Sequence, residues 1–124
     1  MGISVSGFQR PRQVQSPSQA STTSLTLVTA LSITGIGRLI QVSTLGGTNP
    51  STLKITIDGV VIFNATGTAA GTTYYPLTTK NSGGTTIFTS TPINIDLNFK
   101  KSVLIEHCMT GSGTAYTAWS YEIE

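Results

Sequence analysis

Charged residues are scarce in this sequence. They make up 10% of the 124-residue chain, compared with about 25% in a typical globular domain. Seven basic and five acidic residues leave a net charge of +2, whereas nucleic-acid binding requires a dense basic surface. We therefore expect no nucleic-acid partner.

Cysteine and long apolar runs are also scarce. Cys108 is the single cysteine, which excludes an internal disulfide and any multi-cysteine zinc site. The longest run of aliphatic or aromatic residues is VVIF, residues 60–63, whereas a membrane helix needs about 20 such residues. We expect neither a membrane-spanning helix nor a metal or other cofactor.

Threonine and serine are abundant instead, with 22 and 14 copies. Threonine is β-branched and suits a pleated, half-exposed strand surface. Short alternating segments are separated by Gly, Pro and Asn clusters roughly every 8 to 12 residues, and no apolar spacing typical of a helix persists over three turns. The pattern predicts an all-β fold, an antiparallel β-sandwich of about eight strands, with the jelly roll as one form of it.

The clearest predicted element is the hairpin TLKITIDGVVIF, residues 52–63. Asp58 and Gly59 separate two alternating runs, and Asp-Gly favours a type I′ turn because both central residues adopt positive φ. A regular two-residue hairpin gives two cross-strand pairs on one face, Ile57 with Val60 and Ile55 with Ile62. Phe63 is then expected on the opposite face.

Further strands are expected on the same grounds, over residues 24–34, 38–45, 74–79, 85–91, 93–99, 102–109 and 114–124. Alternation also assigns their faces, placing the following sets together: Ile40 with Val42; Ile93, Ile95, Leu97 and Phe99; Trp119, Tyr121 and Ile123.

Residues 1–23 differ from the rest of the chain. They include two prolines, four glutamines and no acidic side chain. Their apolar residues follow neither the spacing of a helix nor the alternation of a strand over any length. Such a composition cannot bury enough apolar surface to offset the loss of chain entropy on folding. We therefore expect an extended N-terminal arm over residues 1–23 and a β-sandwich domain over residues 24–124.

His107 and Cys108 are the residues that a search for catalysis considers first. Neighbours on a strand point to opposite faces, so they cannot form a nucleophile–base pair within that strand. His107 shares its face with Val103 and Ile105 and is expected to be a partly buried structural residue. Cys108 is expected to be a small core residue.

The carboxylates offer no better catalytic arrangement. Asp58 belongs to the hairpin turn, and we expect Asp96 and Glu106 to be solvated or paired with Lys100 or Lys101. No catalytic or metal-binding residue is therefore expected, and the chain is predicted not to be an enzyme.

Two aromatic residues are candidates for surface contact. Tyr74 and Tyr75 follow a loop rich in Gly, Ala and Thr, and stacked aromatic rings can bind sugars. A carbohydrate-binding β-sandwich module is therefore one alternative function.

Three segments together resemble small virion proteins of tailed bacteriophages. The segments are LKITIDGVVIF (53–63), FKKSVLIEH (99–107) and TAYTAWSYEIE (114–124). In those proteins a DG hairpin, a late F-K-x-S-hydrophobic strand and a closing aromatic–acidic strand recur around a β-sandwich. The resemblance covers roughly residues 36–124. It is closest to head decoration (cement) proteins, with tail or fibre components as the alternative.

The resemblance implies a structural protein on the capsid surface of a virion, which binds the major capsid protein and bridges capsomers. It also implies that the N-terminal arm lies across a neighbouring subunit, with Phe8, Arg10, Arg12 and Val14 as contact residues. Arginine side chains there can pair with acidic groups of the capsid. Decoration proteins often form trimers, so a homo-oligomer is expected, with a trimer ahead of a dimer.

Overall fold

The computed structural model describes residues 13–80 and 86–124, which form ten strands. The strands are β1 (Gln13–Thr22), β2 (Val28–Thr34), β3 (Gly37–Gly46), β4 (Ser51–Ile57), β5 (Val60–Thr66), β6 (Thr73–Lys80), β7 (Thr86–Thr89), β8 (Leu97–Phe99), β9 (Ser102–Met109) and β10 (Ala115–Ile123). Within these two ranges there is no helix long and apolar enough to cross a membrane.

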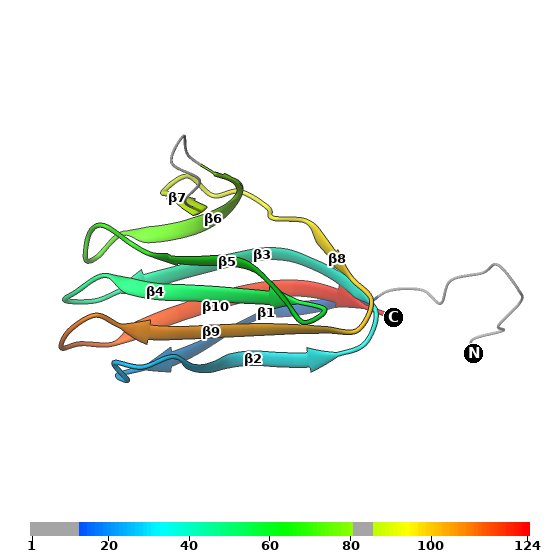
Figure 1. Ribbon diagram of the computed structural model, residues 1–124, viewed down its shortest axis with the longest axis horizontal. Coiled ribbons are helices and arrows are strands. Elements are labelled where there is room, and N and C mark those ends of the chain that lie inside the picture. Colours follow the sequence, from blue (N-terminus) through cyan, green and yellow to red (C-terminus); the bar gives the residue numbers. More distant parts are fainter. Residues whose placement is uncertain (1–12, 81–85) are drawn as a thin grey trace, which may run out of the picture.

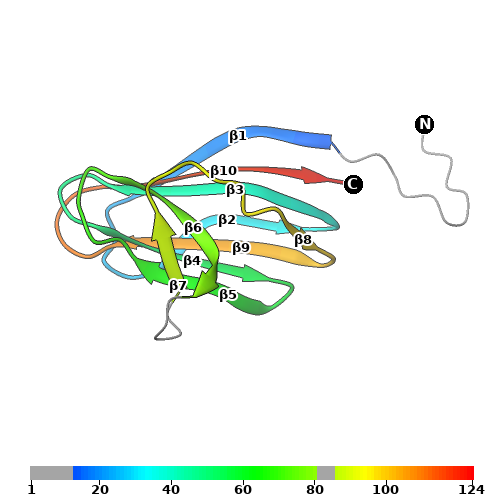
Figure 2. The same ribbon diagram turned by 90° about the horizontal axis from the view of Figure 1, so that it is seen from above.

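The strands form two antiparallel sheets that pack face to face. One sheet has the order β1-β10-β3-β6-β7, with β8 also paired to β3, and the other has the order β2-β9-β4-β5. Figure 2 shows the two layers edge-on, with β1, β10 and β3 in one layer and β2, β9, β4 and β5 in the other. The predicted antiparallel β-sandwich is confirmed.

The strand order is that of a jelly roll. The first strand pairs with the last, β1 with β10, and the second with the next to last, β2 with β9. Further along the chain β3 pairs with β6 and β8, and β4 with β5. The chain thus behaves like one long hairpin rolled into two layers, which is the arrangement of a jelly roll.

Apolar side chains from both sheets fill the space between the layers. The buried members of this core are Leu39, Val42, Leu53, Ile55, Ile57, Phe63, Ile95, Phe99, Val103, Ile105 and Trp119. At the side of the sandwich, the ring of Phe88 in β7 lies 4.8 Å from that of Phe63 in β5 and 5.3 Å from that of Tyr74 in β6. The β6–β7 pair therefore covers the core beside β5 (Figure 2).

The DG hairpin forms as predicted at its turn and differs beyond it. Asp58 and Gly59 have φ of 51° and 82°, and Ile57 pairs with Val60. Ile55, however, pairs with Phe63, because the register shifts between Ile55 and Thr56 and leaves one extra residue in β5.

This bulge reverses the expected faces in β5. Phe63 is 1% exposed and belongs to the core, whereas the prediction placed it on the opposite face. The predicted pairing of Ile55 with Ile62 is also wrong. An inserted residue shifts every later side chain of a strand to the other face, and alternation along the sequence cannot reveal it.

A second bulge changes the faces of β3. Tyr121 pairs with Leu39 and Ser120 with Gln41, which leaves Ile40 as the extra residue. Leu39 and Val42 therefore share the buried face, with exposed fractions of 0% and 1%, and the predicted pair of Ile40 with Val42 is wrong.

The predicted strand over residues 93–99 is shorter in the structure. Only Leu97–Phe99 forms β8, because Asp96 adopts a φ of 48° that a strand does not accommodate. The backbone N–H groups of Ile95 and Asp96 both donate to the carbonyl of Ile40, at 2.8 and 3.2 Å. The bulge in β3 thus provides the acceptor that interrupts this strand.

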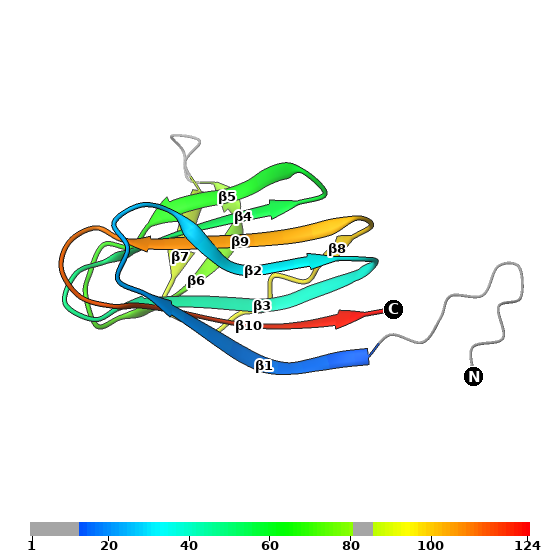
Figure 3. The ribbon, with the colours of Figure 1, turned by 90° about the horizontal axis from the view of Figure 1, so that it is seen from below.

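The N-terminal segment divides into two parts. Residues 1–12 lie outside the described residues, whereas β1 (Gln13–Thr22) is the outermost strand of the larger sheet and pairs with β10 along its length (Figure 3). The sandwich therefore includes residues from Gln13 onward rather than from residue 24. A register shift between Gln15 and Ser18 breaks the alternation that would have identified this strand from the sequence.

Candidate functional site

A chain of four buried polar side chains links the two sheets. The Ser51 hydroxyl in β4 lies 2.9 Å from that of Thr44 in β3, and the Thr44 hydroxyl lies 3.3 Å from that of Thr117 in β10. The Thr117 hydroxyl in turn lies 2.7 Å from His107 Nδ1 in β9. All four side chains are at most 2% exposed. Buried polar groups need such partners, so the chain satisfies them while joining β9 and β4 to β10 and β3.

His107 lies at one end of this polar chain, and its pKa reflects its burial. Burial lowers the pKa of the imidazole, because a charged ring loses the solvation that water provides. The Ser51 hydroxyl and the imidazole are separated by two threonine hydroxyls, so they are not a directly contacting nucleophile and base. The expected structural role of His107 agrees with its burial and its hydrogen bond to Thr117.

At one end of the sandwich, the Asp58 carboxylate binds the backbone of the β8–β9 connection. Oδ1 accepts from the N–H groups of Lys101 at 2.7 Å and Ser102 at 3.0 Å, and Oδ2 accepts from that of Lys100 at 3.0 Å. The Asp58 N–H donates to the carbonyl of Ser102 at 2.9 Å. The pKa of Asp58 is lowered, chiefly by the hydrogen bond from Ser102 and then by that from Lys100, because amide donors stabilise the ionised carboxylate.

Two further backbone hydrogen bonds extend this end. The N–H of Gly35, in the β2–β3 turn, donates to the carbonyl of Lys101 at 2.8 Å, and the N–H of Glu124 donates to that of Ile36 at 2.9 Å. We call the connected residues 35–36, 58–59 and 100–101 the turn cluster. Figure 1 shows the β4–β5 turn, the β8–β9 connection and the C-terminus together at this end.

Exposed apolar and cationic side chains lie in the turn cluster and directly after its β4–β5 turn. Ile36 is 45% exposed, and Val60 and Val61, directly after the β4–β5 turn, are 63% and 50% exposed. Lys100 and Lys101 are also exposed, and neither forms a salt bridge with another described residue.

Two other cations, Lys54 and Arg38, form ion pairs. Lys54 lies 4.0 Å from Glu106, and Arg38 lies 3.3 Å from both Asp96 and Glu122. The expectation for Asp96 and Glu106 was solvation or pairing with Lys100 or Lys101, and the structure instead pairs Asp96 with Arg38 and Glu106 with Lys54. The charge of Lys101 contributes to the lowered pKa of the nearby Asp58 carboxylate.

The opposite end of the sandwich is built from uncharged loops. The Asn49 side-chain amide donates to the carbonyl of Ser112 at 2.8 Å, and the Thr110 hydroxyl donates to that of Pro50 at 2.7 Å. These bonds join the β3–β4 and β9–β10 loops. Exposed apolar residues, Leu25 and Tyr116, occur near this end as well, but no residue of the two loops is charged.

The predicted arm residues lie mostly outside the described part of the chain. Phe8, Arg10 and Arg12 belong to residues 1–12. Val14 lies in β1, where it pairs with Glu122 of β10 in the same chain. Its proposed contact with a neighbouring subunit stays a prediction.

Tyr74 and Tyr75 do not form one aromatic platform. They are adjacent in β6, so their rings point to opposite faces. The Tyr74 hydroxyl lies 3.0 Å from that of Thr68, and its ring packs near Phe88. Both tyrosines are half-buried. Tyr74 therefore contributes to packing at the side of the sandwich.

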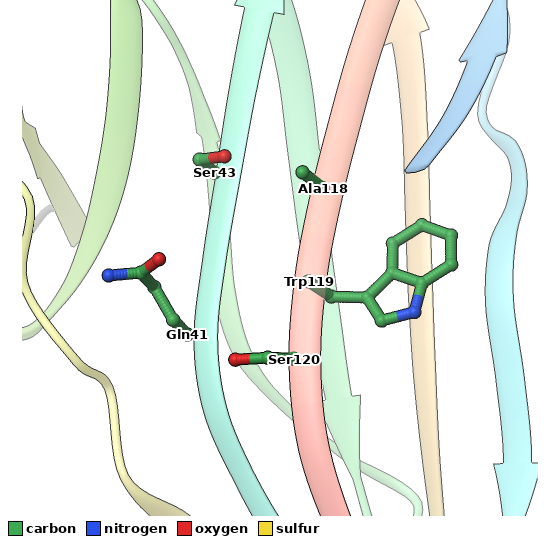
Figure 4. A pocket seen from close by; sticks show the side chains of 5 residues that line it. All are labelled: Gln41, Ser43, Ala118, Trp119 and Ser120. Carbon is green, nitrogen blue, oxygen red and sulfur yellow. The ribbon is translucent and has the colours of Figure 1, made fainter. Parts of the chain in front are cut away.

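A shallow pocket lies between β3 and β10. It has a volume of about 60 Å³ and is lined by Gln41, Ser43, Ala118, Trp119 and Ser120. Figure 4 shows the Trp119 ring directed away from the small side chains that form most of the lining. Ligand pockets usually measure about 300–1,000 Å³, so this depression is too small to enclose a sugar or a cofactor. In residues 13–80 and 86–124 no group of three or more His, Cys, Asp or Glu side chains is arranged to hold a metal.

Comparison with known proteins does not place this chain in a family, because no family model and no curated sequence matches it. Functional inference therefore starts from the turn cluster and the polar chain. Sequence reasoning located Asp58 correctly in its turn but missed its contacts with Lys100 and Lys101. The sequence signals were the Asp-Gly pair and the two adjacent lysines, which are 42 and 43 residues from Asp58.

Proposed function

We propose that this protein is a structural virion protein of a tailed bacteriophage, which binds the outside of the capsid and bridges capsomers as a decoration (cement) protein. Its partners are the major capsid protein and further copies of itself, with a trimer ahead of a dimer. The sequence resemblance over residues 36–124 supports this proposal. The jelly-roll fold is compatible with it, since this fold occurs in viral capsid proteins and also in lectins.

The placement of β1 is the observation that carries the proposal. Gln13, the first residue of β1, pairs with Ile123 at the end of the sandwich that holds the turn cluster. The described chain therefore begins at this end of the sandwich, where Ile36, Val60, Lys100 and Lys101 are exposed. Twelve extended residues can span roughly 40 Å, which is enough to reach a neighbouring subunit.

The chemistry of residues 1–12 fits a segment that binds on assembly. Arg10 and Arg12 can form charge-assisted hydrogen bonds with carboxylates, and Phe8 can enter an apolar depression. Ordering such a segment costs conformational entropy, so each single contact is weak. Repetition over many symmetry-related sites compensates, because each additional attached module raises the effective concentration of the others.

The test is co-sedimentation of the purified full chain with phage heads of its own host system that lack it, with the bound copies counted per head. We expect hundreds of copies on each head. A variant lacking residues 1–12, folded according to circular dichroism, should bind at least tenfold more weakly.

Other results of this experiment reject the decoration role. A few copies per particle, or binding to tails alone, would instead indicate a tail or fibre component. No binding by the full chain would remove the virion proposal and make glycan binding the next function to test.

A further inference from the structure

We propose that Asp58 is a conditional modification site. An isoaspartate forms there when the β4–β5 turn is released from the β8–β9 connection, and not while the two are joined. The modification isomerises the link between Asp58 and Gly59, and its only co-reactant is water. This inference is independent of the virion role.

The reaction begins at the backbone nitrogen of Gly59. This nitrogen attacks Cγ of Asp58, so an N–Cγ bond forms and the bond from Cγ to the carboxyl hydroxyl breaks. The hydroxyl leaves as water with the amide proton, and a five-membered succinimide ring remains. Water then opens the ring: addition at Cγ restores aspartate, whereas addition at the main-chain carbonyl gives isoaspartate. One water is lost and one is gained, and no atom is oxidised or reduced.

The residue after the aspartate favours this chemistry. Glycine has no Cβ to obstruct the approach to its nitrogen. Asp58 is the one Asp or Asn in the sequence that precedes a glycine. A Cβ added at Gly59 would meet no other atom within 4 Å. Packing around Gly59 therefore does not protect the link, and protection in the folded protein has to come from the aspartate.

The Asp58 carboxylate is engaged through both of its oxygens. Oδ1 accepts from the N–H groups of Lys101 at 2.7 Å and Ser102 at 3.0 Å, and Oδ2 accepts from that of Lys100 at 3.0 Å. Ring closure requires Cγ to approach the Gly59 nitrogen in a reactive geometry, which these bonds oppose. They also lower the pKa of Asp58, chiefly the bond from Ser102, so the carboxyl group lacks the proton that its leaving hydroxyl needs.

The backbone of Asp58 is held by the same connection. Its N–H donates to the carbonyl of Ser102 at 2.9 Å, and its φ is 51°. Ser102 thus contacts both the main chain and the side chain of Asp58. Release of the β8–β9 connection therefore frees both parts of the residue at once.

Asp96 provides an internal comparison. It also has a positive φ, of 48°, and is exposed, but Leu97 follows it in the sequence. Its carboxylate lies 3.3 Å from Arg38. A branched side chain on the following residue hinders attack by that residue's nitrogen, so Asp96 should form little isoaspartate whether the chain is folded or unfolded.

An isoaspartate at position 58 would prevent the turn from forming again as it is. The main chain of the turn gains one carbon atom, and the carboxylate is then attached to Cα. The two-residue turn sets the register of the hairpin, in which Ile57 pairs with Val60. A chain that stays open long enough to react therefore cannot regain the same contacts with Ser102.

The first test compares the folded full chain with the same chain unfolded in guanidinium chloride, at physiological pH and temperature. Enzymatic methylation counts the isoaspartyl groups, and chromatography of the proteolytic peptides locates them. Isoaspartate should accumulate at Asp58 at least about tenfold faster in the unfolded chain, because the folded turn opens only rarely. Equal rates in the two states, or no isoaspartate at Asp58 in the unfolded chain, would overturn the proposal.

The second test removes one donor and keeps the Asp-Gly pair. Lys101→Pro eliminates the N–H that makes the shortest bond to the carboxylate, whereas Lys101→Ala removes the same side chain and retains this N–H. In the folded proteins, isoaspartate formation should be at least threefold faster with proline and within twofold of the natural rate with alanine. Equal rates in the two folded variants would reject protection by the backbone donors.

A denaturant series keeps the proposal testable if circular dichroism shows that Lys101→Pro does not fold. In the natural chain, the rate at Asp58 should rise with guanidinium chloride in parallel with the fraction of unfolded molecules. A rate that stays constant through the unfolding transition would show that the folded structure gives no protection.

Discussion

At the scale of single residues, His107 and Asp58 have the surroundings that most affect their ionisation. Burial lowers the pKa of His107, and backbone amide donors lower that of Asp58. Both shifts make the folded state less stable in acid, but over different ranges of pH. As the pH falls, each group binds its proton in the unfolded chain at the ordinary pKa, and in the folded protein only at a lower pH.

The first prediction concerns His107 and pH. Its ordinary pKa is 6.5 and its folded pKa is lower, so the free energy of unfolding should be constant above pH 7.5 and fall as the pH decreases below 6.5. The slope can reach about 1.4 kcal/mol per pH unit for one proton. Urea unfolding at several pH values between 8 and 5 measures how the free energy of unfolding changes with pH.

His107→Gln is the control for this prediction. It should be about 1–3 kcal/mol less stable than the natural chain at pH 8, because the bond to Thr117 is lost or weakened. It should also lose most of the slope between pH 6.5 and 5. An unchanged slope in this variant would assign the acid sensitivity to other groups.

The second prediction compares two aspartates that share a positive φ. Asp58→Asn should lower the midpoint of thermal unfolding at pH 7 more than Asp96→Asn does. Asp58 binds three backbone N–H groups, whereas Asp96 lies in an exposed ion pair with Arg38. Asparagine tolerates the same backbone conformation, so the comparison isolates the carboxylate.

The pH dependence of this difference provides a check. The stabilising effect of Asp58 should be present above its ordinary pKa of 3.8 and be lost as the pH falls through its lower folded pKa. Equal midpoints for the two variants at pH 7 would contradict a special role for Asp58.

At the scale of strands, irregular backbone marks the edges of both sheets. Register shifts interrupt β1, β2 and β5, and β7 is only four residues long. Bulges and short strands hinder pairing between the edges of different molecules. These edges are therefore poorly suited to adding a strand from another chain.

The third prediction tests the bulge in β5. Phe63→Ala should lower the free energy of unfolding by about 3–5 kcal/mol, because it leaves a cavity in the core. Val61→Ala, at a position that is 50% exposed, should change it by less than about 0.5 kcal/mol. Urea unfolding of both variants measures the contrast. A hairpin without the bulge would place Phe63 outward and predict a small cost for its substitution.

The fourth prediction separates β1 from the residues before it. Removal of residues 1–12 should leave the unfolding midpoint unchanged, since β1 stays paired with β10. Removal of residues 1–22 should destabilise the sandwich by on the order of 3 kcal/mol, because several backbone hydrogen bonds and the packing of Ala20 are lost. Equal stability of the two truncated chains would show that β1 contributes little to the folded state.

At the scale of the whole molecule, the jelly roll places its most enclosed strands at the centre of each sheet. β10 and β3 are central in one sheet, and β9 and β4 in the other, while β1 and β7 lie at edges. Local opening requires less free energy where a strand has one partner than where it has two.

The fifth prediction is the resulting order of hydrogen exchange. Backbone amides of β9 and β10 should exchange slowest, and those of β1 and β7 fastest among the strands. Exchange measured by NMR at pH 7 tests this order. Protection of β1 equal to that of β10 would show that the two strands open together.

Much of the fold could be predicted from local sequence, and the errors have a common cause. The β9 strand, the type I′ turn at Asp58 and the burial of Trp119 follow from alternation and from the φ preferences of Asp-Gly. The predicted faces of Ile40 and Phe63 were wrong, because Ile40 is the extra residue of the bulge in β3 and Phe63 follows the extra residue of the bulge in β5. A bulge depends on the partner strand, which alternation along one strand does not specify.

The sequence by itself determined that this protein is an antiparallel β-sandwich with a DG hairpin. Side-chain alternation and turn chemistry act over a few residues, so they can be recognised without a partner strand. Only the tertiary structure decided that β1 pairs with β10, that Thr44 meets Thr117 across 73 residues, and that Asp58 binds the backbone of Lys100 and Lys101. These contacts depend on which strands become neighbours and in what register, and the packing of the whole core settles both.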